Sequence, residues 1–242
     1  MNLALHTFLF SVYPYLCLAV FLIGSLVRFD RDQYTWKSDS SQLLRASQLR
    51  WGSNLFHIGI LFLLLGHSVG LLTPHFAYAP FISAQHKQML AIVSGGVAGS
   101  ICFVGLTLLL HRRITDPRIR ATSRRSDMAV LIILWLQLCL GLASLPWSFA
   151  DRGDAATMLT LADWAQHLLT MRPEPSALLA VPVVFKLHLV LGMTLFVLFP
   201  FTRLVHIWSG FASLAYMWRP YQLVRSRRLH GPRRAARARR EI

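Results

Sequence analysis

Acidic residues and cysteines are scarce in this sequence, and their scarcity excludes several kinds of site. The 242 residues include ten Asp or Glu and three cysteines, against 25 Lys or Arg. Cys17, Cys102 and Cys139 lie far apart, without C-x-x-C or C-x-x-C-H spacing. Neither an iron–sulfur cluster nor covalently attached haem is therefore indicated. Each cysteine falls in a different apolar stretch, which is typical of a small buried apolar residue.

Charged residues are rare along five long stretches of the chain. They make up only 14% of the sequence, whereas hydrophobic residues make up 55%. The apolar stretches are residues 5–27, 53–72, 89–110, 128–149 and 178–207. Each has about 20 residues or more, enough to cross about 30 Å of hydrocarbon as a helix. We therefore predict an all-α, polytopic membrane protein with a bundle of five transmembrane helices.

The first and last stretches each depart from a plain membrane span. No Lys or Arg precedes the first, and no small-x-small cleavage site follows it, so we expect a retained helix rather than a secretory signal. The last stretch is the longest and contains Pro200, which removes one backbone hydrogen bond. A kink or tilt is therefore expected near Pro200.

Basic residues gather in alternate segments between the spans. Residues 28–51, 111–127 and 209–242 hold 20 Lys or Arg, whereas residues 73–88 and 150–177 hold three. Basic loops remain on the cytoplasmic side, so the amino terminus is predicted outside and the carboxyl terminus inside. This topology explains the net charge of +15 without a nucleic-acid partner. We expect residues 1–225 to form the membrane domain and the Arg-rich residues 226–242 a disordered cytoplasmic tail.

Two of the apolar stretches each carry two histidines. His57 and His67 lie in the second, and His188 and His206 lie in the fifth. An ionisable residue within a span costs several kcal/mol unless it has a partner, so it marks a functional site. The second span is predicted to run outward and the fifth inward, which pairs His67 with His188 near the outside and His57 with His206 near the inside. In a continuous helix, the eighteen residues from His188 to His206 are five turns, so both would point the same way.

Each predicted pair has the ligands of a bis-histidine haem b held between two helices. Two axial imidazoles close the iron to substrate, so such a haem carries electrons. Zinc requires more ligands, and no Asp or Glu lies in these spans. The four histidines are therefore candidate iron ligands; the alternative is four histidines that only hydrogen-bond within the helix packing.

Three cationic residues lie close to the histidines in the sequence. Arg203 precedes His206 by three residues, and Lys186 precedes His188 by two. Both are candidates to bind haem propionates, and the alternative is that they extend to the lipid headgroups. Lys87 begins the third span near the expected depth of His67. It could hydrogen-bond a quinol headgroup, or it could only anchor the helix at the interface.

Several motifs stand in order along almost the whole chain. They include S-N-L-F-H-I-G-I-L, G-H-S-V-G-L-L-T-P-H, L-H-L-V-L-G-M-T-L-F and L-F-P-F-T-R-L-V-H-I-W. Together these motifs resemble the gamma subunit of membrane-bound respiratory nitrate reductase, a di-haem cytochrome b. The resemblance implies that His67 and His188 hold the distal haem, and His57 and His206 the proximal one. Two further positions, Gly66 and Lys87, match the quinol site of that family.

The resemblance also implies an activity and its partners. Quinol, either menaquinol or ubiquinol, would be oxidised near the outer face of the bacterial cytoplasmic membrane, and its protons would be released outside. Electrons would then pass through the two haems to a cytoplasmic iron–sulfur beta subunit and a molybdenum alpha subunit that reduces nitrate. Lipids would surround the spans.

Two departures from the expected family pattern stand out. The end beyond Arg225 is longer and more basic than expected, and Lys186 stands where we expect Arg.

Two alternative functions remain open from the sequence. One is a cytochrome b subunit of a related sulfite- or heterodisulfide-linked complex, and the other is a haem-free membrane anchor or transporter.

Overall fold

The structure is a computed structural model that describes residues 2–31 and 46–210, and within these ranges all regular structure is helical. Residues up to His206 form one compact unit, and residues 207–242 form a second, of which the described residues 207–210 are helical. The predicted domain boundary at residue 225 lies outside the described residues. The long helices are α2 (Tyr13–Arg31), α3 (Ala46–Leu72), α5 (Ala84–Thr115), α7 (Arg125–Ala150) and α9 (Val183–Leu198).

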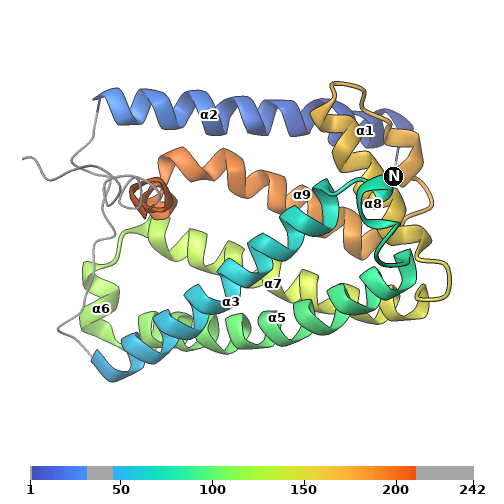
Figure 1. Cartoon of the computed structure of the whole chain (residues 1–242). Helices are drawn as coiled ribbons and strands as arrows, with labels where there is room; N and C mark the ends of the chain where they lie inside the picture. The colour runs from blue at the N-terminus through green and yellow to red at the C-terminus, as the bar shows by residue number, and fades with distance from the viewer. Residues whose placement is uncertain (1, 32–45, 211–242) are drawn as a thin grey trace, which may run out of the picture. The chain divides into compact units, whose positions relative to one another are not determined.

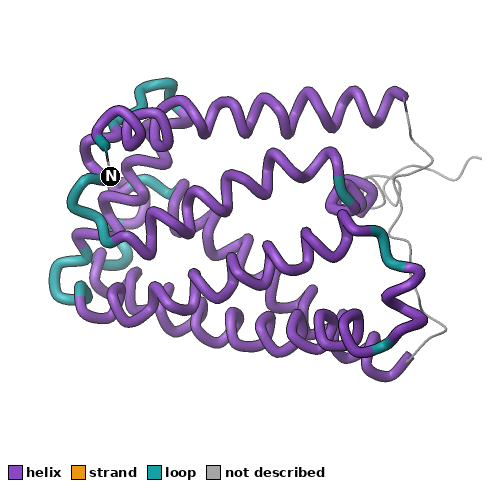
Figure 2. Tube along the Cα trace, turned by 180° about the vertical axis from the view of Figure 1, so that it is seen from behind, coloured by secondary structure: helices purple, strands orange, loops and turns teal. Residues whose placement is uncertain are grey.

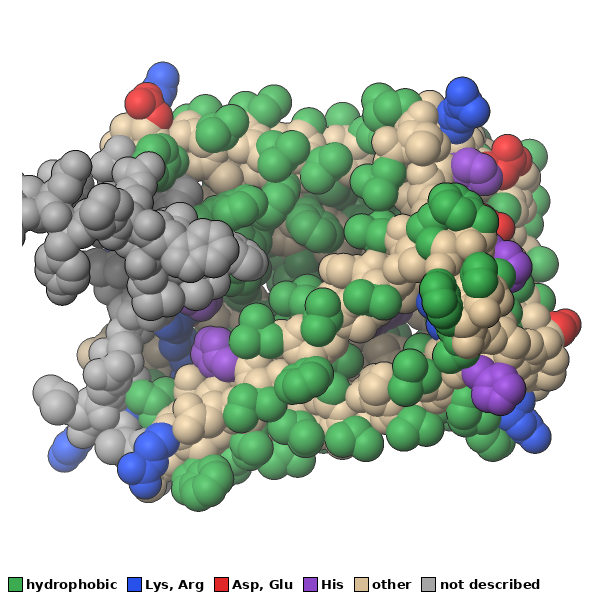
Figure 3. Space-filling model, viewed as in Figure 1, with side chains coloured by type: hydrophobic (Ala, Val, Ile, Leu, Met, Phe, Trp, Pro, Cys, Tyr) green, Lys and Arg blue, Asp and Glu red, His purple; other side chains and the backbone are tan. Residues whose placement is uncertain are grey.

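Within the described residues, five helical segments are long and apolar enough to cross a membrane, which confirms the predicted five-span, all-α fold. The first is Leu3–Arg31, in which α1 (Leu3–Thr7), a π-helical turn η1 (Phe8–Val12) and α2 follow one another. Apolar side chains cover the sides of these helices, and charged side chains gather at their ends (Figure 3). Leu61 and Phe62, for example, are more than 60% exposed, as lipid-facing residues are in a membrane protein.

The long helices pack as a series of neighbours. Helix α3 packs on α5, α5 on α7, α7 on α9, and α9 on α2. The loops and short helices lie at the two ends of the bundle (Figures 1 and 2). The connection from α5 to α7 includes α6 (Pro117–Thr122), and the connection from α7 to α9 includes α8 (Ala156–Leu169) at the opposite end. Helices α3 and α9, which carry three of the four candidate histidines, are not close-packed neighbours among the described elements.

Helices α3 and α5 approach to backbone contact at glycines. A Cβ atom on Gly105 would lie 2.3 Å from the backbone nitrogen of Phe56, and one on Gly59 would lie 2.7 Å from the Cα of Cys102. No side chain fits at either distance, so these glycines allow the close approach that holds membrane helices together. This contact fixes α3, and with it His57 and His67, against the rest of the bundle.

Helix α8 ties the first span to the rest of the bundle at one end. The indole Nε1 of Trp164 donates to the backbone oxygen of Phe10 in η1, at 2.9 Å within the core. Gln166 donates from its side-chain amide to the oxygen of Leu71, at 3.0 Å, near the end of α3. The second bond satisfies a carbonyl in the last turn of α3, which has no helical donor of its own.

The fifth span is shorter than the sequence predicts. Helix α9 begins after Pro182 and ends at Leu198, and two 3₁₀ turns follow, η4 (Phe199–Phe201) and η5 (Arg203–Val205). Between them Thr202 is fully extended, with φ −127° and ψ 179°. The expected deviation near Pro200 is confirmed, but the prediction of one helix over residues 178–207 is wrong. His206 therefore lies beyond a break and does not follow His188 by five continuous helical turns.

The first span stabilises this break. Arg28 on α2 donates from one guanidinium nitrogen to the backbone oxygens of Pro200, at 2.7 Å, and Thr202, at 2.9 Å. These carbonyls lose their helical donors where the helix ends, so a charged donor satisfies them. Gly24 lets the two segments meet, because a Cβ there would lie 2.8 Å from the Cγ of Pro200.

Candidate functional site

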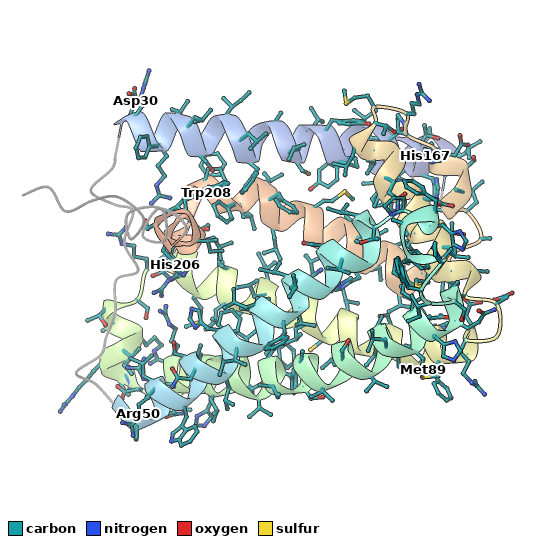
Figure 4. All side chains as sticks on the ribbon, in the orientation of Figure 1. Asp30, Arg50, Met89, His167, His206 and Trp208 are labelled. Carbon is teal, nitrogen blue, oxygen red and sulfur yellow. The ribbon has the colours of Figure 1, made fainter. Side chains whose placement is uncertain are left out.

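The structure brings the four histidines together in the two pairs predicted from the helix directions. The imidazole centres of His67 and His188 lie 6.1 Å apart, and those of His57 and His206 lie 6.5 Å apart. His57 and His67 project from α3, His188 from α9, and His206 follows η5. His206 lies at the same end of the bundle as Asp30 (Figure 4).

All four histidines have the same nitrogen engaged by a backbone carbonyl. The Nδ1–H groups donate to Ser53 (2.7 Å from His57), Leu63 (2.7 Å from His67), Gln137 (3.1 Å from His188) and Arg203 (2.6 Å from His206). A carbonyl can only accept, so Nδ1 carries the proton and Nε2 keeps its lone pair. Such a backbone bond to the remote nitrogen is the usual way in which proteins orient a metal-binding imidazole.

The spacing of each pair fits two imidazoles on opposite sides of one metal ion. Bonds of about 2 Å from each Nε2 to the metal, with about 1.2 Å from each nitrogen to its ring centre, put the ring centres roughly 6.4 Å apart. The observed 6.1 and 6.5 Å lie on either side of this value. Direct hydrogen bonding between the two rings would bring them closer, because a nitrogen-to-nitrogen hydrogen bond needs only about 3 Å. The donor set and its spacing therefore fit a bis-imidazole haem iron.

The surroundings of the pairs differ from those of other metal sites. Within residues 2–31 and 46–210, no group of three or more His, Cys, Asp or Glu side chains is arranged to hold a metal ion. Zinc and non-haem iron need three or four protein ligands. Haem needs two, because the porphyrin supplies the rest. Since α3 and α9 are not packed against each other, a flat group between them would meet the histidines without displacing a helix contact.

The pair formed by His67 and His188 has a neighbour that the sequence did not predict. Gln137, in the middle of α7, accepts from His188 Nδ1 through its backbone oxygen and donates through its side chain to the backbone oxygen of His188, at 3.1 Å. Gly141, one turn further on, makes room for the imidazole, because a Cβ there would lie 3.0 Å from His188 Cε1. The signal in the sequence was a lone amide within a long apolar run.

A carboxylate near His206 was also not predicted. Asp127, in the first turn of α7, lies 3.9 Å from a guanidinium nitrogen of Arg113 and 3.9 Å from one of Arg203. Arg203 thus has two roles beside the pair of His57 and His206: its backbone oxygen orients His206, and its side chain faces Asp127. The partly buried guanidinium lies on the segment that carries His206, where an anionic propionate would be favoured.

Lys87 lies beside the end of α3 that carries His67. Its Nζ donates to the backbone oxygens of Gly70, at 3.2 Å, and Thr73, at 3.4 Å, and lies 3.9 Å from the centre of the Tyr78 ring. Tyr78 is buried in the short helix α4 (His75–Tyr78), and burial raises the pKa of its hydroxyl. The ammonium is thus held by carbonyls and an aromatic face, with no anion among these contacts.

The two remaining predicted positions are placed differently. Gly66 faces open space, because no atom lies within 4 Å of where its Cβ would be. The structure therefore gives Gly66 no protein neighbour on that face, which leaves it accessible to a ligand or lipid. Lys186 donates to the backbone oxygen of Leu179, at 2.8 Å, near the start of α9.

The sequence is similar to those of known proteins. A profile of the nitrate reductase gamma subunit family matches residues 6–227. The respiratory nitrate reductase 2 gamma chain of Escherichia coli is 49% identical over 93% of this chain and 98% of its own length. The respiratory nitrate reductase 1 gamma chain of the same organism is 48% identical over 92% of this chain and 98% of its own length. The nitrate reductase gamma chain of Bacillus subtilis is 38% identical over 90% and 97%.

Proposed function

The chain belongs to the nitrate reductase gamma subunit family, and from this premise we propose that it is the quinol-oxidising cytochrome b subunit of a respiratory nitrate reductase. Quinol, either menaquinol or ubiquinol, gives up electrons and protons near the outer face of the bacterial cytoplasmic membrane. The electrons cross to an iron–sulfur beta subunit and a molybdenum alpha subunit on the cytoplasmic side. Nitrate is reduced on the partner and not on this chain.

One observation carries the proposal: two histidine pairs, each with Nδ1 bonded to a carbonyl and with ring centres at the spacing of a bis-imidazole iron. When bound there, haem b supplies one-electron transfer. A haem held by both histidines of a pair would carry electrons and would not activate a ligand. A nitrate site on this chain is therefore not expected.

The protein's own residues would bind the quinol at the outer end. Lys87 Nζ is a charged donor close to the level of His67, and it can hydrogen-bond a quinol oxygen and stabilise negative charge there as a proton leaves. Gly66, next to His67, has no side chain to obstruct a ring that approaches α3. Burial of quinol between apolar helices also removes its reactive oxygens from bulk water.

The proposal is tested by following the haem spectrum of membranes that contain this chain with its alpha and beta subunits. Adding a menaquinol or ubiquinol analogue should reduce b-type haem, and adding nitrate should then reoxidise it. Haem that is reduced by quinol but reoxidised only by another acceptor would contradict the nitrate reductase assignment. Membranes in which the expressed chain brings no b-type haem would overturn the proposal as a whole.

A further inference from the structure

His188 is oriented differently from the other three candidate ligands. His57, His67 and His206 each donate from Nδ1 to a carbonyl three or four residues earlier in their own segment. His188 on α9 instead donates to Gln137 on α7. Its imidazole plane therefore depends on how a second helix is placed, whereas the other three planes are set locally.

The Gln137 side chain holds the same histidine from its other side. Its amide nitrogen donates to the backbone oxygen of His188, at 3.1 Å, and lies 3.4 Å from His188 Nε2, the atom that would bind iron. Only the NH₂ group can face a carbonyl, so the His188 backbone fixes which way the amide points. The buried Oε1 of Gln137 accepts no hydrogen bond among the described residues. The orientation of the amide is therefore determined by the contact of its nitrogen with His188 and not by a hydrogen bond to its oxygen.

Glycines on α7 and α9 leave room for the side chains of Gln137 and His188. A Cβ on Gly192 would lie 3.0 Å from the amide nitrogen of Gln137, and one on Gly141 would lie 3.0 Å from Cε1 of His188. Gly141 follows Gln137 by one turn on α7, and Gly192 follows His188 by one turn on α9. Gly141 on α7 thus packs against the His188 ring, and Gly192 on α9 packs against the Gln137 amide.

We propose that Gln137 is the positioning residue of the outer haem centre: its backbone oxygen accepts from the His188 imidazole, and its side-chain amide holds the His188 backbone in place and keeps a donor beside the iron-binding nitrogen. The inference rests on the proposed function, because it assumes that His67 and His188 hold a haem. The positive end of the amide dipole favours the reduced iron, which carries less positive charge. Removal of the amide therefore lowers the reduction potential of the outer haem relative to the inner one.

The test is a redox titration of the intact complex, read by absorbance and by the low-spin EPR signals, with Gln137→Met. Methionine keeps an unbranched chain of the same length and removes the donor. We expect the outer haem to titrate at a lower potential. Its EPR signal should also change, because the amide no longer holds the His188 backbone and the signal depends on the angle between the two imidazole planes. The inner haem should be unchanged.

Gln48→Met is the matched control. The Gln48 amide joins α3 to the backbone oxygen of Leu108, away from His188. Both haems should therefore titrate in this variant as they do in the wild type.

The outcomes separate this inference from the function on which it rests. An outer haem with unaltered potential and EPR signal in Gln137→Met overturns the positioning role and leaves the proposed function intact. A wild-type complex without b-type haem overturns both. If Gln137→Met fails to retain the outer haem, Gln137→Glu is titrated instead. It keeps the side-chain shape and exchanges the donor for an acceptor, so the same lowered potential is expected and an unaltered one is contradictory.

Discussion

At the scale of single residues, the two histidine pairs share one chemistry and differ in geometry. Each Nδ1 is bonded to a carbonyl, yet the ring planes of His67 and His188 are inclined by 36° and those of His57 and His206 by 73°. Iron orbitals respond to that angle, so the pairs would give two distinguishable haem spectra. Different neighbours, Gln137 at the outer pair and Arg203 at the inner pair, add to the distinction.

His67→Ala is expected to remove the outer haem and abolish quinol oxidation. The backbone of α3 is unaffected, so the inner pair should retain roughly half of the total haem. Haem content and quinol-dependent haem reduction in purified complexes check this. Loss of the inner haem alone would show that the assignment of pairs to the two ends is reversed.

Lys87→Gln is expected to impair quinol oxidation with both haems retained. Loss of a hydrogen bond from a charged donor costs about 1.5–3 kcal/mol, which corresponds to a fall of about tenfold to a hundredfold in kcat/KM for quinol. Arg152→Gln is the matched control, because Arg152 also lies over an aromatic ring, that of Phe149, and donates to a backbone oxygen. Equal loss in both variants would assign Lys87 to anchoring and not to the quinol site.

At the scale of helices, the positions of the ligands depend on close backbone contacts. Helix α3 carries His57 and His67 and is held against α5 at glycines. Helix α9 ends where the turn at Pro200 packs against Gly24 and accepts a hydrogen bond from Arg28. The second contact lets His206 leave the direction of α9. Ligand placement is therefore a property of helix packing as much as of ligand identity.

Gly105→Ala should destabilise the bundle, whereas Gly95→Ala on the same helix should not. A Cβ at Gly105 meets the Phe56 nitrogen at 2.3 Å, and a Cβ at Gly95 meets nothing within 4 Å. Forced separation of packed helices costs about 1–3 kcal/mol, while alanine in an open helical position gains about 0.5–1 kcal/mol over glycine. Thermal unfolding of the purified complex, with haem release as a second signal, measures both. Equal unfolding temperatures would contradict the backbone contact.

The sequence predicted the elements well and the end of the last one poorly. Runs of apolar residues define five helices because each must cross the same thickness of hydrocarbon. The break after Leu198 could be anticipated from Pro200, but its extent could not, since it is stabilised by Arg28 from the far end of the chain. Gln137 and Asp127 were not predicted for a similar reason. Their roles depend on contacts between helices, which composition and spacing do not reveal.

At the scale of the whole molecule, charge distribution predicts how the bundle sits in the membrane. The basic segments alternate with segments that hold few Lys or Arg. This pattern predicts that the ends carrying Ser123 and Gly153 face opposite sides, with Ser123 in the cytoplasm.

Reporter fusions test that orientation. Alkaline phosphatase fused after Gly153 should be active, because that enzyme folds only outside the cytoplasm, and a fluorescent protein fused after Ser123 should fluoresce. The reverse result would invert the topology. It would also place His67 and His188 on the cytoplasmic side, which the proposed direction of electron flow does not permit.

Whether the two histidine pairs hold two haems is decided by the number of haems per chain, measured by pyridine haemochrome assay of the purified complex and of four single His→Ala variants. We predict about two haem b in the wild type and about one in every variant. The same haem should be lost from His67→Ala and His188→Ala, and the other from His57→Ala and His206→Ala. A wild-type chain with fewer than two haems, or variants that lose them in any other combination, would contradict this prediction.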